Sequence, residues 1–311
     1  MRSLVRTVAV LPLAAALHLS TAAAGDAASP NYCRLTSQGV SLGCQSDARA
    51  DYQVAVANCL NRPDTLARKA CRSAAAVATK EAQEECRDQL EARQDACDEL
   101  GPTPYAPLIT PANFVATIDN PYFPLTPGTT YIYEGQIDGA FERVEFSVTH
   151  RTKVILGVTC VEVHDVATID GERAEDTVDW FAQDVDGNVW YFGENTFELE
   201  DGLISSIDGA WLGGIDEAKP GIVMPAHPAV GDFYRQEFSL ANAEDLAEVL
   251  SLGASVSVPF GTFSPCLQTE ETTPLSPDHR EHKFYAPGIG NVLTIDPETG
   301  ERSELKQIIT E

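Results

Sequence analysis

The chain has 311 residues and a formal net charge of −26 at pH 7, because 47 Asp and Glu residues stand against 21 Lys and Arg residues. Such a charge repels nucleic acid and anionic membrane surfaces, which argues against a protein that binds either of them. A solvated acidic surface is the simplest interpretation of the excess charge.

The N-terminal segment has the pattern of a secretory signal peptide, which we assign to residues 1–24. Arg2 and Arg6 form a basic front, an apolar run covers residues 8–19, and three alanines precede Gly25. The apolar run is too short to span a bilayer, which argues against a membrane anchor. We therefore expect a secreted or periplasmic protein without a membrane span.

Eight cysteines follow this segment, and an even number in an exported chain predicts disulfides rather than catalysis or metal binding. The first six are separated by 11, 15, 12, 15 and 11 residues, which is a palindrome. Facing residues on two antiparallel helices have a constant sum of residue numbers. Only one nested set of pairs has that property: Cys33–Cys97, Cys44–Cys86 and Cys59–Cys71.

The spacing predicts a disulfide-linked antiparallel α-hairpin within residues 25–100. Pro63 can end the first helix and Asp64 can cap the second. The two arms are rich in good helix formers but hold few large apolar residues, so the disulfides take the place of a core. Gly39 and Gly43 indicate an irregular first arm before Cys44.

A proline-rich linker, residues 101–112, separates the hairpin from a region of different composition. Short alternating runs such as TYIYEG, ERVEFSVT and NVWYFG follow it, with Asp-Gly and Gly-Asn turns between them. The expected fold class is mainly β with a small α domain. The hairpin is followed by an antiparallel β-meander over residues 113–311, which forms a curved sheet, a partial barrel or a sandwich.

The β domain contains an internal repeat. Gly128 and Tyr131 recur 103 residues later as Gly231 and Tyr234, and DGNVWYF resembles IGNVLTI at the same shift. The pattern predicts a duplicated β unit, although chance likeness between two meanders is an alternative. The two repeats cover about residues 121–205 and 224–311.

Two further predictions follow from the repeat. Cys160 and Cys266 occupy equivalent positions, so we expect a fourth disulfide between them. The second repeat also holds the insertion NAEDLAEVLSLG, in which Asn242 can cap a short helix and Gly253 can end it.

Residues 113–311 resemble a family of exported, uncharacterised bacterial β proteins. The motifs that carry the resemblance are NPYFPLTPGTTYIYEG, DWFAQDVDGNVWYFGE, KPGIVMPAHPAVGDFYRQE, AEDLAEVLSL and HKFYAPGIG. The resemblance implies an exported all-β domain and brings no catalytic residues with it. The cysteine hairpin lies outside the resemblance.

The sequence shows no strong catalytic or metal motif. It has no H-E-x-x-H, no G-x-S-x-G and no glycine-rich phosphate loop. We name no catalytic residue and no cofactor, with calcium as the one weak metal candidate. Asp184, Asp186 and Asn188 alternate as in calcium loops, but Gly187 falls at position four rather than six of such a loop. A hairpin turn with Asp-Gly at its tip is the alternative.

Aromatic residues gather around the same turn, and Trp180, Trp190 and Tyr191 are the candidate ligand-binding residues. They either fill a core or line an apolar cavity. We expect Glu134 and Glu237 to pair with basic residues on neighbouring strands. The function we expect is an exported, non-catalytic binding protein that carries a hydrophobic small molecule or lipid. The alternatives are a structural or protein-interaction module of the cell envelope, and a hydrolase with a dispersed site.

Overall fold

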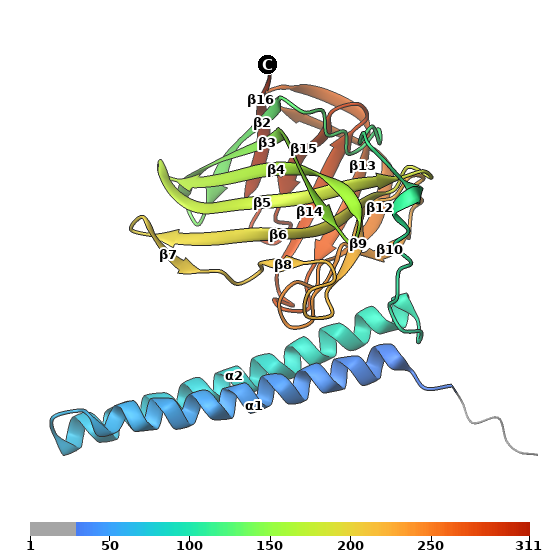
Figure 1. Cartoon of the computed structure of the whole chain (residues 1–311). Coiled ribbons are helices and arrows are strands. Elements are labelled where there is room, and N and C mark those ends of the chain that lie inside the picture. The colour runs from blue at the N-terminus through green and yellow to red at the C-terminus, as the bar shows by residue number, and fades with distance from the viewer. Residues whose placement is uncertain (1–28) are drawn as a thin grey trace, which may run out of the picture. The chain divides into compact units, whose positions relative to one another are not determined.

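The structure is a computed structural model that describes residues 29–311 (Figure 1). The predicted signal peptide, residues 1–24, lies outside the described residues. Two helices are followed by a large antiparallel sheet that is nearly barrel-shaped. The hairpin and the sheet belong to one unit, Asn31–Glu311. The predicted fold class is therefore correct.

The hairpin consists of α1 (Tyr32–Leu60) and α2 (Thr65–Leu100). Asn31 caps α1, and the Asp64 side chain caps α2 by accepting the Ala67 N–H at 2.7 Å. The expectation of an irregular first arm is wrong, because α1 is continuous through both of its glycines. A glycine destabilises an exposed helix by only about 1 kcal/mol relative to alanine. The disulfides between the two helices stabilise the hairpin enough to offset this.

Three disulfides join the two helices with the nested pairing that the spacing predicts. Cys33–Cys97, Cys44–Cys86 and Cys59–Cys71 have Cα–Cα distances of 5.7, 5.8 and 5.5 Å. They supply much of the buried apolar surface of the hairpin, where alanine and cysteine predominate.

A short 3-10 turn, η1 (Pro111–Asn113), leads into the sheet. The strands are β1 (Phe114–Val115), β2 (Thr129–Ile137), β3 (Ala140–Ile155), β4 (Val158–Ile169), β5 (Glu172–Asp184), β6 (Val189–Glu200), β7 (Leu203–Ser206), β8 (Trp211–Leu212), β9 (Lys219–Met224), β10 (Phe233–Arg235), β11 (Glu237–Phe238), β12 (Leu246–Val258), β13 (Gly261–Thr272), β14 (Arg280–Ala286), β15 (Gly290–Ile295) and β16 (Arg302–Thr310).

Two meanders of the same strand order build the sheet. The main path runs β10-β12-β13-β14-β15-β16-β2-β3-β4-β5-β6-β9-β11, and β9 also lies against β10, so the path nearly closes. Gly128 and Gly231 precede the first strand of each meander with φ of 83° and 89°. Their N–H groups donate to Val148 and Val249 on the next strand. These equivalences support the predicted repeats, whose origin by duplication stays a prediction.

The predicted Cys160–Cys266 bridge is wrong, because both residues are buried free thiols. Cys160 packs with Trp180 and Phe192 in a cluster on the outer face of the sheet, whereas Cys266 belongs to the interior core. One extra residue of β13 between Phe263 and Cys266 shifts the alternation of side chains. The strands β4 and β13 are also separated by five strands in either direction along the path.

The predicted helix in the second repeat is also wrong, since the segment forms the beginning of β12. Leu246 and Ala247 are both buried, so both faces of this strand are covered and no alternation marks it in the sequence. β12 pairs with β10 on one side and with β13 on the other, and this pairing outweighs the helical propensity of residues 246–253.

A buried ion pair joins the hairpin to the sheet. Arg93 on α2 donates to both carboxylate oxygens of Glu244, and the two side chains are only 4% and 2% exposed. Glu244 also accepts the Ala241 N–H at 2.7 Å. The geometry is bidentate and the two side chains are buried, so the contact between hairpin and sheet includes a specific polar interaction.

One end of the sheet is closed by the segment that precedes β2, residues 118–125. Asn120 donates to the Gly187 carbonyl in the β5–β6 turn at 2.9 Å. In the other meander, the Gly288 N–H of the β14–β15 turn donates to Pro121 at 2.7 Å. The segment therefore bridges equivalent turns of the two meanders and forms a floor across this end.

Candidate functional site

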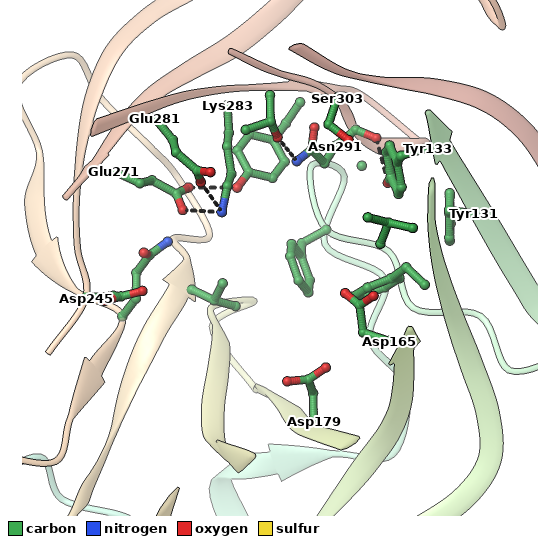
Figure 2. A pocket seen from close by; sticks show the side chains of 18 of the residues that line it. Tyr131, Tyr133, Asp165, Asp179, Asp245, Glu271, Glu281, Lys283, Asn291 and Ser303 are labelled. Carbon is green, nitrogen blue, oxygen red and sulfur yellow. Dashed lines mark hydrogen bonds and ion pairs between the residues drawn. The ribbon is translucent and has the colours of Figure 1, made fainter. Parts of the chain in front are cut away.

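The interior of the sheet holds a cavity of about 680 Å³, lined by residues of both meanders (Figure 2). Alternate residues of a strand point into it, as the two-residue period of a strand requires. On β3 these are Glu142, Val144 and Phe146, and on β2 they are Tyr131 and Tyr133.

The floor of the cavity is apolar and aromatic. Phe123 and Leu125 come from the closing segment, and Ile289 comes from the β14–β15 turn. Phe181 packs against Phe123 at 5.3 Å between ring centroids and stacks on Tyr191 at 4.6 Å. Because these rings pack on one another, this part of the cavity has a fixed shape.

Acidic side chains concentrate toward the opposite end, where the strands bearing them begin or finish. Glu142 lies near the start of β3, Glu175 near the start of β5 and Glu281 near the start of β14, while Glu271 lies at the end of β13. The cavity therefore changes from apolar to acidic along its length.

One side of the cavity carries a closed polar cluster. The Lys283 ammonium lies 2.8 Å from Glu271 and 3.3 Å from Glu281, and the Tyr285 hydroxyl donates to Glu271 at 2.9 Å. Burial opposes the charge on Lys283, but the two carboxylates outweigh it and raise the pKa of this lysine well above its ordinary value. Lys283 is thus a charged residue whose partners are already in place.

Across the cavity, neither Asp165 nor Asp179 forms a salt bridge with any residue of the described range 29–311 (Figure 2). Burial raises the pKa of Asp179 to about 7, although a hydrogen bond from the Tyr191 hydroxyl works in the other direction. Burial and then the charges of Asp179 and Glu175 raise the pKa of Asp165 well above its ordinary value. Asp179 therefore titrates near neutral pH rather than near pH 4, and the pKa of Asp165 is shifted in the same direction.

Two further carboxylates extend this group. Burial, and then the charge of Asp179, raises the pKa of Glu194 on β6 to about 8. Burial, and then the charges of Asp245 and Glu194, raises the pKa of Glu237 well above its ordinary value. The carboxylates thus form one interacting set in which each negative charge opposes the next.

The structure separates the three predicted ligand-binding residues. Tyr191 lines the cavity, while Trp180 and Trp190 lie on the outer face, in a cluster against which Ile109 of the linker and Phe114 of β1 pack. Lys153 lies over the Trp180 ring at 3.6 Å. Trp211 is the tryptophan of the interior, with its ring 5.5 Å from that of Tyr191.

The predicted calcium residues form the β5–β6 turn. Asp184 accepts the backbone N–H groups of Asp186 and Asn188 and the indole N–H of Trp190 at 2.8–3.0 Å. Its carboxylate is therefore engaged within its own hairpin, as the turn alternative requires. Within residues 29–311, no group of three or more His, Cys, Asp or Glu residues is arranged to hold a metal ion. A calcium site here stays a prediction.

The two symmetric glutamates have different environments. Glu134 pairs with Arg143 at 3.0 Å and Lys306 at 3.5 Å, so the predicted ion pair is confirmed. The same expectation is wrong for Glu237, which is buried at the cavity beside other carboxylates. Equivalent positions in the two meanders therefore face opposite sides of the sheet.

Sequence reasoning missed the interior carboxylates. A signal exists, because Asp179 precedes Phe181 by two residues and Glu142 precedes Phe146 by four, so each acid shares a face with an inward aromatic ring. The signal becomes usable only when the inward face of each strand is known.

No protein-family profile matches the chain, and no curated protein matches its sequence. Among solved structures, a "putative lipoprotein" from Parabacteroides distasonis aligns at 14% identity and a TM-score of 0.34. The alignment covers 60% of this chain and 98% of that one. This likeness is too weak to carry an argument, and the resemblance of residues 113–311 to exported bacterial β proteins stays a proposal. In the part of the chain that is described, no helix is long and apolar enough to cross a membrane.

Proposed function

We propose that this protein is an exported binding protein that holds one small amphipathic molecule inside its β domain. The observation that carries the proposal is the interior cavity of about 680 Å³, which lies within the range of ordinary ligand sites. Its apolar floor suits a hydrocarbon or ring system, and its acidic end suits a polar group.

The energetics favour such a ligand. Each methylene that leaves water for the apolar floor contributes about 0.8 kcal/mol. Phe181 and Tyr191 stack rigidly, so the pocket does not need to form when the ligand enters. Pre-organisation of this kind lowers the cost of binding.

The compartment agrees with this role. The three disulfides of the hairpin indicate an extracellular or envelope location, since such bridges persist in oxidising compartments. A carrier or binder in that compartment has to shield an apolar molecule from water, which an interior cavity does.

A cavity-filling substitution tests the proposal. Val144→Phe places a ring in the cavity, whereas Val154→Phe puts the same ring near the far end of the same strand, at a residue that is 67% exposed and does not line the cavity. Native mass spectrometry of the full chain is carried out separately with dodecylamine, dodecanol and dodecanoate. It should show a complex with one bound probe, and the mass of the bound probe should equal that of the free probe, because no reaction is expected. Binding should be lost in Val144→Phe and retained in Val154→Phe.

Two results would contradict the proposal. One is that none of the three probes binds the wild-type chain. The other is that Val144→Phe binds as well as Val154→Phe while circular dichroism shows both to be folded.

A further inference from the structure

We infer that the ligand of this cavity is an organic cation, with an apolar body and a protonated amine or quaternary ammonium group. The inference rests on the proposed function and names the chemical class of its ligand. It is carried by the charge, the burial and the aromatic surface of the cavity.

The first step is the charge of the lining. Ten of the residues that line the cavity are Asp or Glu, whereas only Lys283 and Arg302 carry a permanent positive charge. Lys283 is already paired with two of the ten acids, and Arg302 is paired with Glu304 at 2.6 Å. Within residues 29–311, the other eight lining carboxylates form no salt bridge with Lys283 or Arg302.

The second step is the burial of these carboxylates. Glu142, Asp179 and Glu237 line the cavity and are only 9%, 6% and 7% exposed. Over the described range, residues 29–311, none of them forms a salt bridge. A buried carboxylate without a cation is costly and holds a proton more readily, as the raised pKa values of Asp179 and Glu237 indicate, whereas a cation that enters the cavity stabilises the ionised form.

The third step is the aromatic surface beside the acids. Phe181 lies two residues from Asp179 on the same face of β5, and Phe146 lies four residues from Glu142 on the same face of β3. The Tyr131 ring meets Phe146 edge-on at 6.2 Å. Aromatic faces attract ammonium groups, and the attraction is strongest where water is excluded.

Other ligand classes fit less well. A fatty acid would bring another negative charge to a lining that is already acidic, and a neutral lipid would leave the carboxylates unpaired. A bare metal ion would not use the apolar floor, and the metal-site geometry needed for it is missing from the described residues.

Matched twelve-carbon probes test the inference on the full chain. Isothermal titration calorimetry should compare dodecylamine, dodecyltrimethylammonium, dodecanol and dodecanoate, each below its critical micelle concentration. We expect both cations to bind at least about tenfold more tightly than dodecanol. Dodecanoate should bind most weakly.

Two substitutions locate the effect. Asp179→Asn and Glu237→Gln keep the size of each side chain and remove its charge, so each should reduce the preference for the amine over the alcohol by about tenfold. Glu145→Gln is the control, because Glu145 lies on β3 but pairs with Arg143 outside the cavity. It should leave the preference unchanged.

The outcomes separate the two proposals. Equal affinity for the alcohol and the amine, or a preference for dodecanoate, would overturn the inference while leaving a binding function intact. A preference that survives both cavity substitutions would overturn it as well. Failure of all four probes would overturn the binding function and the inference together.

Discussion

Asp179→Asn should make the protein more stable at neutral pH, which is an unusual expectation for a buried polar residue. Burial raises the pKa of Asp179 from 3.8 to about 7, and the neighbouring charge of Glu175 adds to this effect. The groups that face it are Tyr191, which donates a hydrogen bond, and Glu194 and Asp165, whose carboxylates repel it. Asparagine keeps an oxygen that accepts the tyrosine hydroxyl and carries no charge.

The sign and the size follow from proton linkage. The folded state holds the Asp179 proton between about pH 4 and pH 7, where the unfolded state releases it, so stability falls as pH rises through this window. Each pKa unit corresponds to about 1.4 kcal/mol, so the full shift is worth about 4 kcal/mol. We expect the difference in unfolding free energy between the variant and the wild type to grow by about 2–4 kcal/mol in favour of the variant from pH 4 to pH 8. The lower end applies because local relaxation around Asp179 reduces the penalty of its charge.

Urea unfolding of both chains at pH 4 and pH 8, followed by circular dichroism, measures the difference. Glu145→Gln is again the control, because its exposed side chain should give the same small effect at both values. The reasoning is refuted if Asp179→Asn destabilises the protein at pH 8, or if its effect is the same at pH 4 and pH 8.

Two further predictions concern the scaffold, and thermal unfolding checks both. Arg93→Met should lower the free energy of unfolding by about 3–5 kcal/mol, because it leaves the buried Glu244 carboxylate unpaired. The double variant Arg93→Met with Glu244→Gln should recover part of this stability. A double variant that is no more stable than Arg93→Met alone would contradict the prediction. Gly193→Ala should be strongly destabilising, because φ is 138° and a Cβ would lie 2.5 Å from the Trp211 carbonyl oxygen. Gly253→Ala, where nothing lies within 4 Å, should change stability by no more than about 0.5 kcal/mol.

The hairpin could be predicted almost completely from the sequence. The palindrome of cysteines fixes both the antiparallel direction and the register, because a covalent bond brings specified residues together whatever the rest of the chain does. The cap at Asp64 then follows from local chemistry alone.

The sheet was less predictable because long-range pairing decides it. Leu246, Val249 and Leu250 form a helical stripe in the sequence, yet they lie on a strand covered on both faces. The bulge before Cys266 reverses which face this residue occupies, and Pro265 within the strand indicates a bulge or an edge without fixing the number of extra residues. The extra residue and the five strands that separate β4 from β13 together keep Cys160 and Cys266 apart.

The site was hidden by the composition itself. Among 47 acidic residues, Asp179 is set apart only by its two-residue spacing from Phe181, and this spacing does not say which face of the strand turns inward. The role of the interior carboxylates depends on which face of the strand turns inward and on what the closing segment excludes from the cavity. The cluster of aromatic residues correctly indicated that the β5–β6 hairpin contributes to the cavity. Of the three predicted ligand-binding residues, however, only Tyr191 faces inward.

The nested bridges also constrain the order in which the chain can fold and oxidise. Cysteines next to each other in the sequence, such as Cys33 and Cys44, close short loops and collide most often in an unfolded chain. Once the helix has formed, those 11 residues span about 16 Å, which is too far for a disulfide. The native partners then lie with Cα atoms between 5.5 and 5.8 Å apart. Apart from the native Cys59–Cys71 pair, neighbouring cysteines that oxidise before helix formation are mispaired and have to reshuffle by thiol–disulfide exchange, whereas a hairpin that forms first brings the native partners together.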